Sequence, residues 1–202
     1  MGENWIERRL RRTPINVRVV TKRTMIVVAI DPGIRNLGWA VYNTTTACFI
    51  SFGRYDLLKD QPKNLHTKYA HLVRSFVDAS SDVFAMADAV AIEIQMTAKF
   101  KVIATAFQCF FWGKSYRVSP RSVRCHFKIS TGNYAKNKKA SIELIPSLDI
   151  PAKNKAWYSA MDKNKRDDVA DAMLLALYWS CKHREKPNKK AHKSSKKRRR
   201  IE

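Results

Sequence analysis

The chain has 202 residues, of which 39 are Lys or Arg and 17 are Asp or Glu, so its formal net charge is +22. This length suffices for one domain of ordinary size with a hydrophobic core. So large a positive excess favours binding to a polyanion, with a solubilising run of charge as the alternative.

The four cysteines are scattered and form no CxxC pair, which argues against a zinc module and against a disulfide scaffold. No apolar run approaches the roughly 20 residues of a membrane span, and the Arg-rich N-terminus lacks the apolar stretch of a secretory signal. We therefore expect a reduced intracellular protein that is not secreted and does not contact a membrane. An organelle transit peptide is the alternative for the Arg-rich leader.

Charge is concentrated at the two ends of the chain. Residues 1–24 hold seven Lys or Arg and two acids, and residues 182–202 hold eleven and two. We expect a basic N-terminal arm, a central domain over residues 25–181, and a basic disordered C-terminal tail.

Three apolar segments open the central domain: Met25 to Asp31, Leu37 to Asn43 and Cys48 to Asp56. Their order and short connections predict an antiparallel meander of three strands. The first segment is apolar enough to be buried on both faces, yet it ends on the carboxylate of Asp31. Either Asp31 opens the turn at Pro32-Gly33, or its charge is paired or holds a cation.

The spacing of apolar residues from Leu65 to Val77 predicts a helix that covers one face of the sheet. Asp88 to Gln95 returns to strand character, with Glu93 among apolar neighbours. Glu93 either faces water on an edge strand or repeats the unusual placement of Asp31.

Thr97 to Trp112 predicts a second helix and Tyr116 to Ser119 a short fifth strand. The basic segment from Pro120 to Lys139 is typical of a loop in contact with an anion. Ser141 to Leu148 is expected to be a short helix, and Pro146 to Trp157 a connector.

Asp167 to Cys181 predicts the last helix. Acids in the first turn of a helix interact favourably with its dipole, which is one explanation for them. Asp168 and Asp171, however, are three residues apart and lie on one face, where like charges repel unless a cation lies between them.

Asp31, Glu93, Asp168 and Asp171 thus come from three separated elements. Mg²⁺ prefers such hard oxygen ligands, and a pair of ions can activate water and stabilise the leaving oxygen during phosphodiester cleavage. Carboxylates on an otherwise basic protein fit cations bound beside a phosphate backbone. The sequence therefore predicts a divalent-metal site.

Three motifs make the chain similar to a known family: IDPGIRNLGWAVYN (residues 30–43), AIEIQMTAKF (91–100) and DDVADAMLLA (167–176). They resemble, in order, the acidic motifs of the RuvC-type Holliday junction resolvases of the RNase H-like superfamily. GNYAKNKKASIE (132–143) resembles the branch found in poxviruses and other large DNA viruses.

The resemblance implies an α/β protein with an RNase H-like fold, a mixed five-stranded sheet flanked by helices. It implies a homodimer that nicks a four-way DNA junction symmetrically, in recombination or in processing of replicated viral DNA. Mg²⁺ would be the cofactor, with Mn²⁺ as a substitute, and no small-molecule cofactor is implied. The four carboxylates named above match the family's metal-binding residues.

The family's lysine at the scissile phosphate corresponds to Lys139, with Lys138 as a close competitor. Met96 falls where the bacterial enzymes place an aromatic wedge that enters the junction, and ordinary core packing is the alternative. Arg124 and Lys128, with these two lysines, are further candidate DNA contacts.

Several alternatives stay open. The protein could be a general RNase H-like nuclease on branched DNA or hybrids, or a non-catalytic junction-binding protein; an actin-like ATPase is disfavoured by the scarcity of Gly-rich loops. The expected location is a DNA-containing compartment, such as a viral replication site in host cytoplasm or nucleus. The C-terminal KKRRR is either a DNA contact or a nuclear import signal.

Overall fold

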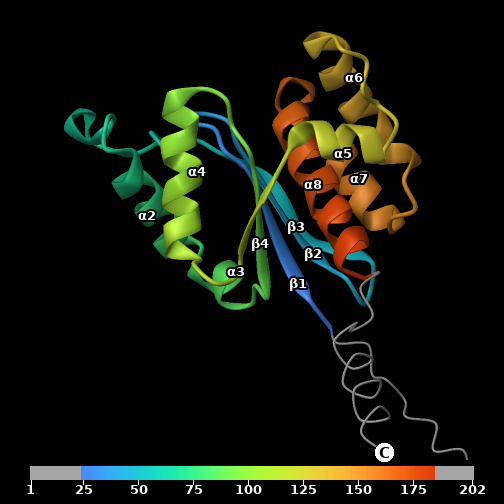
Figure 1. Ribbon diagram of the computed structural model, residues 1–202, viewed down its shortest axis with the longest axis horizontal. Helices are drawn as coiled ribbons and strands as arrows, with labels where there is room; N and C mark the ends of the chain where they lie inside the picture. Colours follow the sequence, from blue (N-terminus) through green and yellow to red (C-terminus); the bar gives the residue numbers. More distant parts are fainter. Residues whose placement is uncertain (1–23, 185–202) are drawn as a thin grey trace, which may run out of the picture.

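The computed structural model describes residues 24–184, and its centre is one five-stranded sheet (Figure 1). The strands are β1 (Ile26–Asp31), β2 (Leu37–Asn43), β3 (Cys48–Tyr55), β4 (Ala89–Glu93) and β5 (Ser115–Val118), in the order β3-β2-β1-β4-β5. β1, β2 and β3 form the antiparallel meander, whereas β1 pairs with β4, and β4 with β5, in parallel. The predicted mixed sheet is confirmed.

Helices cover both faces of this sheet (Figure 1). One side carries η1 (Lys63–Leu65), α2 (Tyr69–Ala79), α3 (Ser81–Ala85) and α4 (Ala98–Phe110). The other side carries α5 (Pro120–His126), α6 (Tyr134–Leu144), η2 (Ile145–Ser147), α7 (Ala152–Ala160), η3 (Lys163–Lys165) and α8 (Arg166–Arg184).

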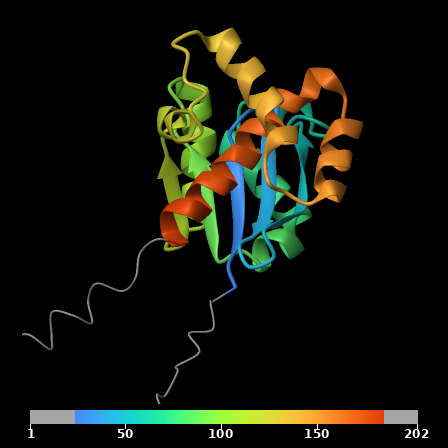
Figure 2. The same ribbon diagram turned by 90° about the vertical axis from the view of Figure 1, so that its right-hand side faces the viewer.

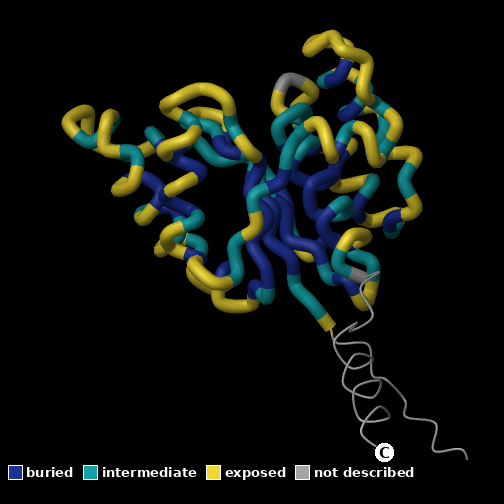
Figure 3. The backbone as a smooth tube through the Cα atoms, in the orientation of Figure 1, coloured by how far each residue is buried: buried dark blue, intermediate teal, exposed yellow. Residues whose placement is uncertain are grey.

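Alternation along the strands divides the core into two layers. Val28, Ile30 and Ile92 pack in the layer of α2 and α4, and their neighbours Ala29 and Ala91 pack in the layer of α8. All five side chains have no exposed surface, and Figure 3 shows the buried backbone concentrated in the sheet and the helix segments that face it. The first strand is therefore buried on both faces, as its apolar run predicts.

Helix α8 lies across the strands of the sheet (Figure 2). The sheet offers it small side chains, Ala29, Ala40 and Ala91, and α8 contributes its own alanines to the same layer. At Gly38 of β2 the approach is closest, because a Cβ there would lie 2.1 Å from the backbone oxygen of Asp168. Any larger residue at this position would collide with the first turn of α8.

Two predictions for the region between the last strand and α8 are wrong. The segment from Pro120 to Lys139, expected to be a loop, contains α5 and the first half of α6. Pro120 occupies the first turn of α5, where its missing N–H costs nothing, and the Asn133 side chain caps α6 by accepting from the Lys136 N–H. The connector expected after Pro146 contains α7. These helices are short and largely polar, so their apolar periodicity is weak.

Other boundaries shift by a few residues. The helix predicted from Leu65 begins at Tyr69, and α8 runs to Arg184 instead of ending at Cys181. Most of the expected N-terminal arm and C-terminal tail, residues 1–23 and 185–202, lie outside the described residues. Within residues 24–184, no helix is both long and apolar enough to cross a membrane.

Candidate active site

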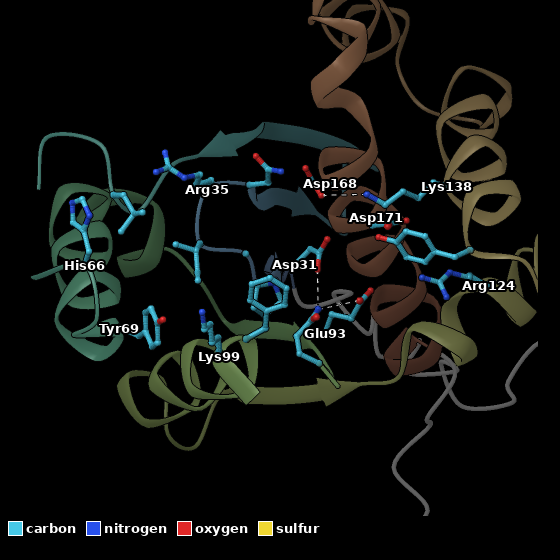
Figure 4. Close-up of a pocket in the computed structure, with 18 residues that line it drawn as sticks. Asp31, Arg35, His66, Tyr69, Glu93, Lys99, Arg124, Lys138, Asp168 and Asp171 are labelled. Atoms are coloured by element: carbon cyan, nitrogen blue, oxygen red, sulfur yellow. Dashed lines mark hydrogen bonds and ion pairs between the residues drawn. The ribbon is translucent and has the colours of Figure 1, made fainter. Parts of the chain in front are cut away.

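The candidate site lies at one edge of the sheet, where two parallel strands end. β1 and β4 are paired in parallel with Ile30 opposite Ile92, so the next residues, Asp31 and Glu93, are neighbours. Carboxyl ends of adjacent parallel strands are where open α/β sheets commonly bind ligands. The start of α8 brings Asp168 and Asp171 to the same place (Figure 4).

All four predicted carboxylates line one open cavity of about 620 Å³. Segments from both sides of the sheet complete its walls, among them the turn after β1, α2, α4, α5 and α6. Basic and polar groups in the lining are Arg35, Asn36, His66, Gln95, Lys99, Arg124 and Lys138. A surface with buried acids at its centre and cations around them suits an anionic substrate held by metal ions.

Burial decides between the alternatives for Glu93. β4 lies between β1 and β5, so it is an internal strand, and Glu93 is only 9% exposed. The interpretation that Glu93 faces water on an edge strand is therefore wrong. The Asp31 carboxylate accepts from the side chain of Gln95, 64 residues along the chain, so its role extends beyond the turn at Pro32-Gly33.

The pKa values of the four carboxylates are all raised, mainly by burial. Burial, followed by repulsion from the other carboxylates, raises the pKa of Asp31 well above its usual value and that of Glu93 to about 8. Burial raises the pKa of Asp168 to about 6 and also raises that of Asp171, although Arg124 and Lys138 oppose the latter effect. The nearby basic side chains thus compensate the four acids only in part, and a divalent cation would supply the remaining positive charge.

Gln95 is a site residue that the sequence analysis missed. Its side-chain nitrogen donates to Asp31 Oδ1 at 3.0 Å and to Glu93 Oε1 at 3.2 Å. The available signal was the spacing of Glu93 and Gln95, because alternate residues of an extended segment face the same way.

Lys138, and not Lys139, enters the cavity. Lys138 donates to Asp167 and lies 4.0 Å from Asp168 Oδ1, and its ammonium also lies over the ring of Tyr134. Lys139 points away, with its side chain 77% exposed and 3.7 Å from Glu143. Consecutive residues of a helix are about 100° apart around its axis, so only one of them can face α8. Of the two candidates for the lysine at the phosphate, the cavity therefore favours Lys138 over Lys139.

The remaining predicted DNA contacts do not all lie at the cavity. Arg124 of α5 lines the cavity. Lys128 is exposed just beyond α5, in a left-handed backbone conformation, and does not line it. Met96, in the segment between β4 and α4, is 82% exposed. Core packing for Met96 is therefore wrong, and its side chain is available for contact with a partner.

Hard carboxylate oxygens fit Mg²⁺ or Mn²⁺. In the conformation of residues 24–184, however, no three His, Cys, Asp or Glu side chains converge closely enough to hold a metal ion. Instead, Gln95 donates to two of the four carboxylates, and Lys138 lies beside a third. The chemistry of the donors fits a divalent cation, and side-chain rotation would be needed to bind it.

The chain is similar to the solved structure of fowlpox virus resolvase with its substrate Holliday junction DNA. That alignment has a TM-score of 0.57 and 22% identity and covers 77% of this chain and 97% of the other. For the fowlpox virus Holliday junction resolvase alone, the values are 0.54, 23%, 77% and 96%. Thermus thermophilus RuvC with a Holliday junction substrate aligns at a lower TM-score of 0.44, with 20% identity over 76% and 91% of the chains. No curated protein sequence matches.

The fowlpox likeness, together with the strand order and the flanking helices, shows that this chain has the fold of the fowlpox virus resolvase. A family model described as "Poxvirus A22 protein" matches residues 25–183. The chain therefore belongs to the Poxvirus A22 protein family. The resemblance to the poxvirus branch is confirmed.

Proposed function

We propose that the protein is a metal-dependent endonuclease that resolves four-way DNA junctions by symmetric nicks. The observation that carries this proposal is the meeting of Asp31, Glu93, Asp168 and Asp171, from three elements, in one cavity with basic walls. The names of the fowlpox neighbours support the substrate, since both are resolvases. A purely basic binder would gain nothing from four acids gathered in one cavity.

The proposed chemistry is hydrolysis of a phosphodiester. The four carboxylates would hold Mg²⁺, or Mn²⁺ in its place, and the bound ions would supply charge stabilisation and an activated water. Lys138 is the protein's own cation beside the carboxylates, and it would contact a nonbridging oxygen of the scissile phosphate. Arg124, on the wall of α5, would neutralise backbone charge nearby.

The first experiment is cleavage of an end-labelled immobile junction by the purified protein, with Mg²⁺ and with EDTA. Linear duplex and RNA–DNA hybrid of the same sequence are the controls. Paired, ligatable nicks only in the junction with Mg²⁺ are expected. Equal cutting of all substrates would establish a general nuclease instead, and tight binding without cutting would establish a non-catalytic junction-binding protein.

Single carboxylate variants separate chemistry from binding. Asp31→Asn and Glu93→Gln should reduce cleavage below detection, because each removes a charge needed to hold the ions. Junction affinity in EDTA, measured by gel shift, should stay within about threefold, since binding rests on basic groups. Cleavage that survives either change would refute the site.

The proposed enzyme acts as a homodimer, because paired nicks need two copies of a site that each chain holds once. A face for this contact is the apolar groove between α2 and α4, of about 400 Å³, where Val102 and Phe110 are 48% and 39% exposed. A V102D/F110D double variant should sediment as a monomer at concentrations where the parent is a dimer. When bound to an uncut junction, the double variant should be monomeric. A parent protein that sediments as a monomer on DNA would refute the dimer.

The proposed setting is viral DNA processing inside the host cell, in the compartment where that DNA is replicated. Membership of a poxvirus family supports it.

A further inference from the structure

Gln95 lies where a cation would be expected, between two of the proposed metal ligands. It lies two residues past Glu93, the last residue of β4, and the intervening Ile94 N–H donates to the carbonyl of Val118, the last residue of β5. The backbone therefore stays extended past Glu93, so the Gln95 side chain faces the same way as Glu93, toward Asp31. Figure 4 shows Asp31 and Glu93 close together, with dashed contacts at both.

The amide of Gln95 contacts both carboxylates at once. An amide nitrogen carries two hydrogens, and here it lies 3.0 Å from Asp31 Oδ1 and 3.2 Å from Glu93 Oε1. Asp31 and Glu93 come from adjacent strands and repel each other across the site. The amide is the group that draws these two oxygens toward one point.

We propose that Gln95 is a positioning residue that takes the place of a cation between Asp31 and Glu93, and that a divalent ion must displace its amide to bind. This inference rests on the proposed metal-dependent function. The N–H groups of the amide and a cation would bind the same two oxygens. The partly positive amide hydrogens and the cation would also repel each other there. Displacement therefore costs the two hydrogen bonds that the amide makes.

The Gln95 amide should therefore stabilise the protein without metal and lower its affinity for metal. With the amide in place, the metal-free site is held together, but ions bind more weakly than they would to the bare carboxylates. Removal of the amide should lower the stability of the metal-free protein and raise its affinity for the ion. A purely structural role would lower stability without tightening metal binding, and a role as metal ligand through the amide oxygen would weaken binding.

The test is Mn²⁺ binding to the full chain by titration calorimetry, together with thermal unfolding in EDTA. Gln95→Ala should bind Mn²⁺ about tenfold more tightly than the parent, from the lost hydrogen bonds, and should unfold at a midpoint lower by about 2–4 °C or more in EDTA. Gln95→Met, which keeps the volume and removes the donors, should change both in the same direction and covers the case in which the alanine variant fails to fold.

The matched control is Gln108→Ala. Gln108 is also partly buried, and its side-chain oxygen accepts from Arg117 at 3.5 Å, but it lies in α4 away from the carboxylates. Its Mn²⁺ affinity should equal that of the parent. Equal or weaker Mn²⁺ binding by both Gln95 variants would overturn the inference. A parent that binds no Mn²⁺ would overturn the metal site of the proposed function and the inference with it, which distinguishes the two failures.

Discussion

At the scale of single residues, the site is defined by acids whose ionisation is unfavourable because they lie in a largely buried environment. Glu93 is almost fully buried, and its pKa is raised to about 8 because burial disfavours the charged form. Such a group either keeps its proton or acquires a positive neighbour. Arg124, Lys138 and Arg54 supply such charge to the four acids, yet the pKa values of all four stay raised, so the described cavity still favours a cation beside them.

Lys138 and Lys139 offer a prediction in which two adjacent identical residues serve as each other's control. Lys138→Ala should reduce junction cleavage about 100-fold, the usual effect of removing one donor to developing negative charge. Lys139→Ala should change it less than about threefold, because its ammonium pairs with Glu143 at the surface. Single-turnover cleavage rates measure both, and the reverse order of effects would return the assignment to Lys139.

At the scale of elements, the site depends on how closely α8 approaches the sheet. The small side chains Ala29, Ala40 and Ala91 make room for the helix, and Gly38, opposite Asp31 in β2, contacts the backbone of Asp168. The same contact therefore connects the end of β1 with the start of α8. The position of Asp168 and Asp171 therefore depends on Gly38, a residue without a side chain.

Gly38→Ala should consequently move α8 and damage the site. Its Cβ would lie 2.1 Å from the Asp168 backbone oxygen, which cannot rotate away. We expect a loss of about 1–3 kcal/mol in the free energy of unfolding, as for other overpacked positions, and cleavage at least about tenfold lower.

Gly53→Ala on β3 is the control for that variant, because its Cβ would meet only the Trp39 ring, at 3.3 Å or more. Urea unfolding and cleavage rates report the two effects. A Gly38→Ala protein with the parent's stability and activity would contradict the role of this contact.

At the scale of the whole molecule, the raised pKa values of the carboxylates predict how folding responds to pH. Glu93 has a reference pKa of 4.5 and a folded pKa of about 8, so between these values the folded protein holds a proton that the unfolded chain releases. Raising the pH through this window therefore favours unfolding. The thermal midpoint in EDTA should fall from about pH 5 to about pH 8, by calorimetry.

The control for this pH dependence is Glu93→Gln, which mimics the protonated group and should give a flatter profile. Saturating Mg²⁺ should raise the parent's midpoint most at the alkaline end, where the carboxylates are ionised and a bound ion stabilises only the folded state. A midpoint in EDTA that rises through this window in the parent and in the variant alike would contradict the raised pKa of Glu93.

The sequence by itself determined the sheet and the identity of the acids. Long apolar strands with regular alternation are strong local signals, and a carboxylate within such a strand, as at Asp31 and Glu93, is conspicuous because burial of a lone charge is costly. The sequence predicts the end of α6 as a short helix from Ser141, but α5, the first half of α6 and α7 were missed. The stability of these short polar helices comes from caps and from packing on the rest of the fold rather than from an apolar stripe.

Only the tertiary structure decided which neighbours those acids have. The choice of Lys138 over Lys139 depends on the rotation of α6 against α8, and the bridge from Gln95 to Asp31 joins residues 64 positions apart. The exposure of Met96 and the contact of Gly38 with Asp168 likewise depend on how distant segments pack. Local patterns determine which way a side chain faces along its own strand or helix, whereas what it meets there is determined by elements from elsewhere in the chain.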